Sequence, residues 1–326
     1  MHAVFYEKNG PAREVIKLSE INTPQPGPGE VRVKLTMSGV NPSDVKARAG
    51  STRKITYPRV IPHSDGAGEI DMVGDGVSVT RLGERVWLWN AQWLRAFGTC
   101  AEYVALPSAQ AVRLPDNVSF EVGACLGIPA MTAFHAVAVA QAAPGVTLLV
   151  AGGAGAVGHH AIQFAKEAGA TVIATISSPE KAKAARAAGA DHVIDYKHED
   201  VGERVMAMTG RKGVDGIIEL DIAANAKLIP QVLRPRGTVV VYGTGASEAD
   251  VPLFFFLRNA IALKFIYVYE LDPVERAAAL NGITRALAAG KLITNIGAVL
   301  PLAETAAAHE AVEQGKVLGN VVVQIR

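Results

Sequence analysis

The stretch 146–175 constrains the fold more than any other part of the chain. It reads VTLLVAGGAGAVGHHAIQFAKEAGATVIAT, in which Gly153, Gly155 and Gly158 have G-x-G-x-x-G spacing. A short apolar run precedes these glycines, a helical pattern follows them, and a second apolar run covers 171–176. The order strand, glycine turn, helix and strand predicts a unit that binds a dinucleotide.

Pyrophosphate binding explains why glycines stand at these places. The first glycine permits a tight turn, the second lets the backbone approach the pyrophosphate, and the third lets helix and strand pack closely. The free N–H groups at the start of the helix lie at the positive end of its dipole, which favours an anion. The expected cofactor contacts in this turn are Gly153, Gly155, Ala156, Val157 and Gly158.

The residues after the second strand bear on which dinucleotide is bound. An NAD site usually places Asp or Glu about 20 residues beyond the glycines, where it holds the ribose 2′-hydroxyl. Here the strand is followed by Ser177, Ser178, Pro179, Glu180 and Lys181, with no acid directly at its end. Two hydroxyls and a lysine favour a 2′-phosphate, and therefore NADPH over NADH, while Glu180 argues against this choice. The same residues also fit a helix cap at Ser177 or Ser178 with a solvated Lys181, and both interpretations hold together.

Composition and charge exclude several classes of function. The chain has 326 residues, of which 49% are hydrophobic and 19% charged, and this suits two domains with cores of their own. The net charge is +1 without a basic, aromatic-interleaved patch, so nucleic acid is not an expected partner. No apolar run is long enough for a membrane span, and the first residues lack a signal peptide's apolar segment, so we expect a cytoplasmic protein. Two cysteines exclude a disulfide framework and a cysteine-based structural zinc site.

The pattern of predicted elements changes along the chain. Short strands are predicted first, over 31–37, 68–73, 85–89 and 101–106. From about residue 122 strands alternate with helices, and six strands are predicted over 146–150, 171–176, 192–195, 214–220, 238–242 and 262–268. Helices are predicted between them over 179–188, 199–208 and 223–233, followed by helices over 273–289 and 303–313 and a strand over 320–325. We therefore predict an α/β fold in which a doubly wound parallel sheet, residues 123–269, is inserted in a β-rich domain of residues 1–122 and 270–326.

Several motifs besides the glycines resemble those of one known family. They are Gly39-Val40-Asn41-Pro42 with Asp44, Ile61-Pro62 with Asp65-Gly66-Ala67-Gly68, Gly98-Thr99 with Ala101-Glu102-Tyr103, and the glycine turn 153–158. Their order along nearly the whole chain resembles medium-chain dehydrogenase/reductases, and among these the zinc-free quinone oxidoreductase group that includes zeta-crystallin. The resemblance implies a GroES-like catalytic domain, a Rossmann domain that binds NADPH, a substrate cleft between them and a homodimer.

The resemblance also implies roles for individual residues. Asn41 matches the active-site asparagine of the quinone reductases, and Thr132 matches the threonine beside the nicotinamide. Asp44 is expected to hold the local turn by bonding to the backbone. Further cofactor contacts are implied for Ser177, Lys181 and Tyr196 at the adenine-ribose phosphate, for Gly243 and Thr244 in the cofactor channel, and for Phe265 and Ile266 where the sixth strand passes the nicotinamide and forms the dimer edge.

The chain departs from the family's pattern near the asparagine. The quinone reductases usually have a tyrosine a few residues later, but this region reads Val45-Lys46-Ala47-Arg48. Tyr57 is a candidate proton donor, and a partly buried aromatic side chain before Pro58 is the equal alternative. His63 stands where a glycine is usual, and Asn320 replaces a common lysine. These departures affect the identity of the substrate more than that of the cofactor.

No metal is expected. On the resemblance, the positions that bind catalytic zinc in zinc-dependent relatives hold Asn41, Ser64 and Ile128, which are poor ligands or none. His63 beside Asp65 lacks a clustered third ligand.

The remaining histidines are expected to be structural. No pairing is expected of His309 or of the other isolated histidines, and His159 and His160 are expected to face solvent or the cofactor loop. The run 254–256, Phe-Phe-Phe, is expected to pack at the dimer contact or over the cleft.

The missing ligands constrain the chemistry. Hydride transfer to an ordinary ketone builds alkoxide charge, which normally needs a Lewis acid or a positioned proton donor. A quinone or an α,β-unsaturated carbonyl disperses that charge by conjugation. We therefore predict an NADPH-dependent oxidoreductase that reduces small-molecule quinones or enones. The alternatives are a zinc-free alcohol or aldehyde dehydrogenase and a crystallin-like structural protein that binds NADPH.

Overall fold

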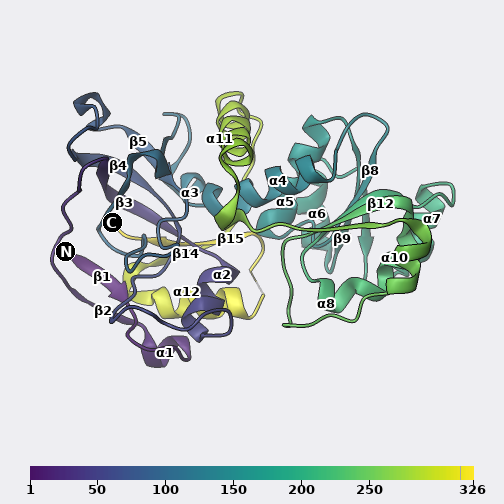
Figure 1. The fold of residues 1–326 in the computed structure, drawn as a ribbon, viewed down its shortest axis with the longest axis horizontal. Helices are drawn as coiled ribbons and strands as arrows, with labels where there is room; N and C mark the ends of the chain where they lie inside the picture. The colour runs from purple at the N-terminus through teal and green to yellow at the C-terminus, as the bar shows by residue number, and fades with distance from the viewer. Residues whose placement is uncertain (316) are drawn as a thin grey trace. The chain divides into compact units, whose positions relative to one another are not determined.

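The computed structural model describes residues 1–315 and 317–326 (Figure 1). Within these residues the chain divides into two compact units, one made of residues 1–129 and 283–326, the other of residues 130–282. The first unit is rich in β-strands and the second holds a parallel sheet with helices, so the predicted α/β fold class is confirmed. The domain boundaries after residues 122 and 269 stay a prediction about functional domains.

The first unit contains a mostly antiparallel sheet. Among the described residues its strands follow the order β14 (Ile296–Pro301), β15 (Asn320–Gln324), β3 (Glu30–Val40), β4 (Asp65–Val73), β5 (Arg85–Leu88) and β7 (Ala111–Arg113), and β6 (Tyr103–Pro107) pairs with β3. A separate antiparallel pair is formed by β1 (His2–Phe5) and β2 (Lys17–Glu20). Val31, Val33 and Leu35 of β3 alternate with more exposed residues and point into the core, as the period of a strand requires.

The helices of the first unit are short. They are α1 (Ala12–Val15), α2 (Pro42–Ala49), α3 (Phe120–Gly123) and α12 (Thr305–Glu313). The sequence did not predict α2, although Asn41 and Asp44 form a capping box at its start and Gly50 ends it with a φ of 81°. The C-terminal strand β15 pairs with β3, Val321 opposite Val40. The last residues of the chain therefore complete the sheet that carries Asn41 at the end of β3.

The second unit is built on a parallel sheet. In the described part of the chain its strand order is β10 (His192–Asp195), β9 (Thr171–Ile176), β8 (Thr147–Val150), β11 (Val214–Glu219), β12 (Leu233–Val241) and β13 (Ala262–Phe265). The chain moves outward from β8 in one direction and then restarts beside it with β11, which is the order of a doubly wound sheet. Its helices are α4 (Met131–Val139), α5 (Ala156–Glu167), α6 (Pro179–Ala187), α7 (Val201–Met208), α8 (Ile222–Asn225), α9 (Ile229–Val232) and α10 (Leu253–Asn259). The helix α11 (Pro273–Ala288) begins in this unit, and the boundary after residue 282 falls within it.

Several predicted elements of this unit differ from the structure. The strand expected over 238–242 is β12, which begins five residues earlier, at Leu233. The helix expected over 223–233 is broken into α8, a 3-10 turn over Ala226–Leu228 and α9. Pro230 lacks a backbone N–H, and Leu233 already belongs to β12, so a continuous helix does not fit there. The sixth strand ends at Phe265 rather than at residue 268, because a 3-10 turn begins at Val268.

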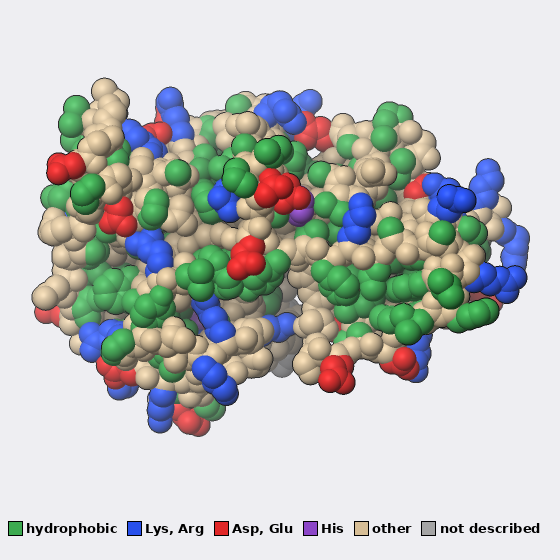
Figure 2. Space-filling view, viewed as in Figure 1, with side chains coloured by type: hydrophobic (Ala, Val, Ile, Leu, Met, Phe, Trp, Pro, Cys, Tyr) green, Lys and Arg blue, Asp and Glu red, His purple; other side chains and the backbone are tan. Residues whose placement is uncertain are grey.

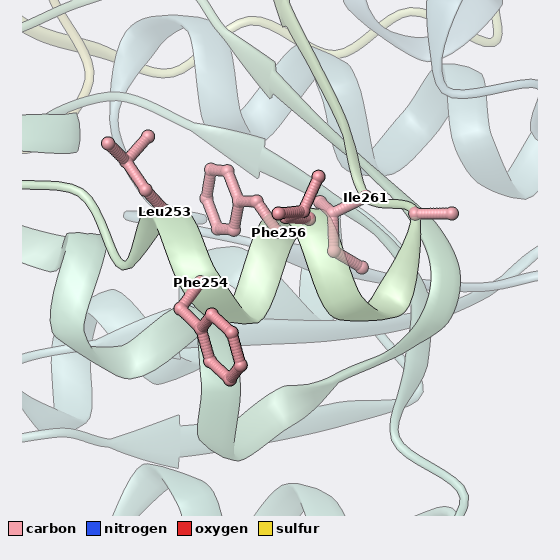
Figure 3. Close-up of a pocket in the computed structure, with 6 residues that line it drawn as sticks. Leu253, Phe254, Phe256 and Ile261 are labelled. Carbon is pink, nitrogen blue, oxygen red and sulfur yellow. The ribbon is translucent and has the colours of Figure 1, made fainter.

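The helix α10, which the sequence did not predict, carries an apolar surface. Figure 2 shows hydrophobic side chains gathered around this helix on the second unit. Leu253, Phe254 and Leu257 are 70%, 75% and 81% exposed, and they line an open hollow of about 770 Å³ with Phe256 and Ile261 (Figure 3). Among the described helices none combines the length and the apolar character that crossing a membrane requires.

Candidate functional site

The glycine turn links β8 to α5, as the sequence predicts. The tight turn itself depends on Gly152, whose φ is +64°, and not on Gly153 as expected. A Cβ atom at Gly153 would lie 2.6 Å from the Cβ atom of Ala174 on β9. Gly153 is therefore required by close packing against the neighbouring strand, and the role of the first glycine is corrected accordingly.

The other two glycines shape the start of α5. Gly155 is the N-cap residue of this helix. A Cβ atom at Gly158 would lie 2.4 Å from the carbonyl oxygen of Gly152, so the third glycine does allow close packing of the helix on the turn. Ala156 and Val157 belong to the first turn, where backbone N–H groups have no partner within the helix. These N–H groups and the helix dipole favour a bound anion.

The residues after β9 combine a helix cap with a lysine–serine pair. Ser178 is the N-cap of α6 and accepts a hydrogen bond from the backbone N–H of Lys181 at 3.3 Å. The Nζ atom of Lys181 donates to Oγ of Ser177 at 3.0 Å. Each interpretation of this segment therefore applies to a different serine. Ser178 caps the helix, and Ser177 holds the ammonium group of Lys181 near the end of the strand.

A hollow of about 460 Å³ opens at the carboxyl ends of β8, β9 and β11. Tyr196, which is 53% exposed, lines it together with Thr175 and Glu219. Oγ1 of Thr175 accepts from the N–H of Gly152 at 3.0 Å and so ties β9 to the glycine turn. Ligands of doubly wound sheets bind at this edge, where the strand order reverses. No sequence motif marked Thr175 or Glu219 as site residues.

Glu219 is held inside this hollow. Its Oε1 atom accepts from the N–H of Asp221 at 2.6 Å and from Nδ2 of Asn225 at 2.8 Å. Burial raises the pKa of Glu219, and these hydrogen bonds oppose the rise. The carboxyl group thereby orders the loop that forms one wall of the hollow.

The candidate residues after β12 and β13 have different environments. A Cβ atom at Gly243 would lie 2.3 Å from the carbonyl oxygen of Leu220, so this position needs a glycine. The hydroxyl of Thr244, an exposed residue, donates to the carbonyl of Ala246 at 2.8 Å. Phe265 is 68% exposed at the end of β13, and the N–H of Ile266 donates to the carbonyl of Val241 at 3.0 Å.

In the first unit Asn41 lies buried between β3 and α2. Its backbone N–H donates to Oδ2 of Asp44 at 2.8 Å, so Asp44 holds the turn as predicted. Burial raises the pKa of Asp44 to about 7. The side chain of Asn41 donates from Nδ2 to Oδ2 of Asp65 at 2.8 Å. Asp44 therefore fixes the backbone of Asn41 and Asp65 its side-chain amide, and sequence reasoning had given a role of this kind to Asp44 alone.

Asp65 connects Asn41 to a second segment of the first unit. The N–H of Ile128 donates to both carboxylate oxygens of Asp65 at 2.9 Å. Ile128 lies in a π-helical turn over Leu126–Ala130, and a Cβ atom at Gly127 would lie 2.1 Å from Oδ1 of Asp65. Burial raises the pKa of Asp65 well above its usual value, while hydrogen bonds from Ile128 and Asn41 oppose the rise.

The three positions considered for zinc do not fit that metal. Asn41 and Ile128 each direct an N–H donor at Asp65. A metal ion needs a lone pair from its ligand, and an N–H donor offers none. The third position is the hydroxyl-bearing Ser64. Within the described residues no three His, Cys, Asp or Glu side chains gather as metal ligands would. The donor set at this place is suited to hydrogen bonding.

A buried polar chain runs behind Asp65. Nε2 of His63 lies 2.9 Å from Nε2 of His309, and Nδ1 of His63 lies 2.8 Å from Oγ of Ser38. Oγ of Ser38 lies 2.7 Å from Oγ1 of Thr99, which donates to the carbonyl of Asp65 at 2.5 Å. The expectation that His309 is unpaired was wrong, because a partner 246 positions away in sequence leaves no local pattern.

Other histidines also differ from expectation. His198 was expected to be unpaired, but its Nδ1 atom lies 3.0 Å from Oδ2 of Asp195. His159 and His160 were expected to face solvent or the cofactor loop, but both are buried in α5. The apolar face of this helix is wider than the predicted stripe, and it includes both rings. Burial lowers the pKa of His160 to about 3, and the neighbouring His159 lowers it further.

The remaining catalytic candidates lie in different units. The hydroxyl of Tyr57 donates to the carbonyl of Leu94 at 2.6 Å, and the ring is partly buried in the first unit. Thr132 is buried near the start of α4 in the second unit. Thus the structure places Asn41 with Asp44, Asp65 and Ile128 in one unit, and the glycine turn with Ser177 and Lys181 in the other.

Comparison with known proteins identifies the family of this arrangement. Residues 27–116 match the family model of the alcohol dehydrogenase GroES-like domain, and residues 156–283 match that of the zinc-binding dehydrogenases. Quinone oxidoreductase from Rattus norvegicus is 33% identical over 94% of this chain and 91% of its own length. The chain belongs to the quinone oxidoreductase group of the medium-chain dehydrogenase/reductase superfamily. The resemblance drawn from the sequence is thereby confirmed.

Other members of the superfamily agree with this assignment. The 2-haloacrylate reductase from a Burkholderia species is 30% identical over 99% of this chain and 98% of its own length. The crystal structure of Escherichia coli quinone oxidoreductase complexed with NADPH superposes with a TM-score of 0.89, at 25% identity and full coverage of both chains. The fold of this quinone oxidoreductase relative therefore extends over the whole chain.

Proposed function

We propose that the protein is an NADPH-dependent oxidoreductase that reduces quinones or enones without a metal. The observation that carries this proposal is the fixation of Asn41 by Asp65. The amide of Asn41 has two N–H donors, and one of them is bound to Asp65. The other is assigned to the acceptor's oxygen, where a hydrogen bond stabilises the charge that develops during reduction.

The second unit supplies residues that fit NADPH. The N–H groups at the start of α5 suit the pyrophosphate, and the pair Ser177–Lys181 suits the 2′-phosphate. Tyr196, Gly243 and Thr244 would contact the rest of the nucleotide, with Thr132, Phe265 and Ile266 assigned to the nicotinamide. Bound NADPH supplies a hydride. The names of the relatives support this assignment, because the Escherichia coli enzyme was solved with NADPH.

The choice of acceptor follows from the donor set. Asn41 offers a neutral hydrogen bond, which suffices for a quinone or enone because conjugation spreads the negative charge. Tyr57 is assigned as a proton donor only if its bond to Leu94 opens, since its single hydroxyl hydrogen is donated there. The 2-haloacrylate reductase, whose named substrate has an activated double bond, supports including such acceptors.

A turnover assay tests the proposal. NADPH oxidation is followed with 1,4-benzoquinone, with an enone and with an aldehyde, each before and after treatment with a chelator. We expect turnover of the quinone or the enone that the chelator leaves intact. Turnover of the aldehyde alone would favour an alcohol or aldehyde dehydrogenase, NADPH binding without any turnover would favour a structural protein, and a metal-restorable loss would overturn the metal-free reaction.

We further propose a cytoplasmic homodimer. Cys100 and Cys125 are both free and buried, as expected in a reducing compartment. The dimer is assigned to the edge strand β13 with the apolar surface of α10.

A further inference from the structure

The proposed reaction leaves the buried hydrogen-bond chain from His309 to Asp65 unexplained. Its members, His309, His63, Ser38, Thr99 and Asp65, are all fully buried. His63 also has a φ of +76°, a backbone conformation that side chains other than glycine rarely adopt. Strained residues of this kind cluster at functional sites.

The hydrogen atoms of this chain can be assigned one after another. Thr99 has one hydroxyl hydrogen and donates it to the carbonyl of Asp65. Ser38 must therefore donate its own hydrogen to Oγ1 of Thr99. Oγ of Ser38 is then the acceptor toward His63, so Nδ1 of His63 carries the hydrogen.

The same reasoning fixes the second imidazole. Burial lowers the pKa of His63 to about 3, so this ring is neutral and its Nε2 atom has a lone pair. His309 must donate from Nε2 to that lone pair. Burial also lowers the pKa of His309, whose Nδ1 then has a lone pair too. No partner for this Nδ1 atom is found among the described residues, so the chain of donors begins at His309 and ends at Asp65.

We propose that His63 and His309 are positioning residues that hold Asp65, and through it Asn41, in place for the reaction. This inference rests on the proposed function of Asn41. Asp65 is fixed at both ends, because its carbonyl accepts from Thr99 while its carboxylate accepts from Asn41 and Ile128. All hydrogen bonds in this row donate in the direction from His309 to Asp65. Loss of the first donor, Nε2 of His309, therefore lets the hydroxyls of Ser38 and Thr99 reorient.

Two variants of His309 test the role of its donor. His309→Leu removes the Nε2 donor. His309→Gln keeps a donor, because its amide N–H stands about as far from the backbone as Nε2 of the histidine. We expect kcat of His309→Leu to fall by about tenfold or more, with KM for NADPH unchanged, because a misplaced contact slows the reaction. His309→Gln should retain most of kcat. A lowered melting temperature with wild-type kcat in His309→Leu would show a merely structural role and overturn the inference.

A double-mutant cycle with Asn41 separates the inference from the proposed function. If His309 acts through Asn41, adding His309→Leu to Asn41→Ala lowers kcat no further. Fully additive losses would overturn the positioning role alone. Wild-type kcat in Asn41→Ala would overturn the proposed role of Asn41, and the inference with it.

The hydrogen assignment has a readout that does not depend on activity. In 15N nuclear magnetic resonance spectra of the labelled full chain, we expect His63 as the Nδ1–H tautomer and His309 as the Nε2–H tautomer. In His309→Gln the His63 tautomer should persist, whereas in His309→Leu its Nε2 loses the donor. The opposite tautomers in the wild-type protein would overturn the direction of the chain.

Discussion

On the proposed function, Lys181 is the residue that decides between the two nicotinamide dinucleotides. Lys181 is held by Ser177 at the end of β9, and the proposal assigns it a charge-assisted hydrogen bond to the 2′-phosphate. We predict that Lys181→Ala raises KM for NADPH by about tenfold, since such bonds contribute about 1.5 kcal/mol or more, and raises KM for NADH much less. Steady-state kinetics with both cofactors measure the difference.

The same helix offers a matched control. Lys183 is exposed on α6, and Lys183→Ala removes an equal charge two positions away. Its KM values should stay near those of the wild type. Equal increases of KM for NADPH and NADH in Lys181→Ala would remove the phosphate assignment.

Burial of His160 predicts a pH dependence of stability. Its pKa falls from 6.5 to about 3 on folding, so between these values the unfolded chain binds a proton that the folded protein does not. The free energy of unfolding therefore decreases as the pH falls from 6.5 toward 3, by at most about 1.4 kcal/mol per pH unit. The difference in the free energy of unfolding between wild type and His160→Leu should shift in favour of the variant over this range.

Urea denaturation at pH 7 and pH 5 measures this shift. His192→Leu, at an exposed position of β10, controls for the loss of a histidine as such. A difference between wild type and His160→Leu that is the same at both pH values would contradict the assigned effect of burial.

At the scale of elements, the start of α5 depends on Gly158. A Cβ atom at this position would lie 2.4 Å from the Gly152 carbonyl oxygen, which belongs to backbone and is not the far end of a flexible side chain. We predict that Gly158→Ala destabilises the fold by about 1–3 kcal/mol, as overpacking does. Thermal unfolding measures it. Gly27→Ala is the control, because the nearest atom to its Cβ is a flexible Glu30 side-chain oxygen at 3.5 Å; equal melting temperatures for both variants would contradict the prediction.

The elements that sequence predicted best are those with local signals. The strands 171–176 and 192–195 were predicted with the bounds found. For 171–176 the signal is a mostly apolar run that marks a buried strand. The strand β14, with the sequence Ile-Gly-Ala-Val-Leu-Pro, was not predicted; its residues alternate in burial and it pairs with β15. The helix α2 is polar overall, so its capping box was a better signal than its hydrophobic pattern.

In the candidate site, too, local features could be predicted from the sequence and long-range contacts could not. The glycine turn and the serine–lysine segment are contiguous in sequence, so their places could be predicted, although the role of the first glycine was not. The anchoring of Asn41 by Asp65, and of Asp65 by Ile128, joins residues 24 and 63 positions apart. No periodicity records such contacts. The pairing of His63 with His309 depends in the same way on the last helix returning to the first unit.

At the scale of the whole molecule, the exposed edge of the parallel sheet predicts assembly. Among the described strands β13 has a neighbour on one side, β12, and unpaired sheet edges favour pairing with another chain. Leu257 of α10 is 81% exposed in the apolar surface that precedes this strand. A second copy of the chain would cover both features, since a closed dimer uses the same surface twice.

We therefore predict a homodimer that a charge on this surface disrupts. Sedimentation should give twice the chain mass of 34.2 kDa for the wild type and a shift toward the monomer for Leu257→Asp, because a buried unpaired carboxylate opposes association. Val79→Asp, at an apolar position of the first unit that is 69% exposed, should leave the dimer intact. A wild-type protein that sediments as a monomer would exclude the dimer, and disruption by Val79→Asp with none by Leu257→Asp would move the interface to the other unit.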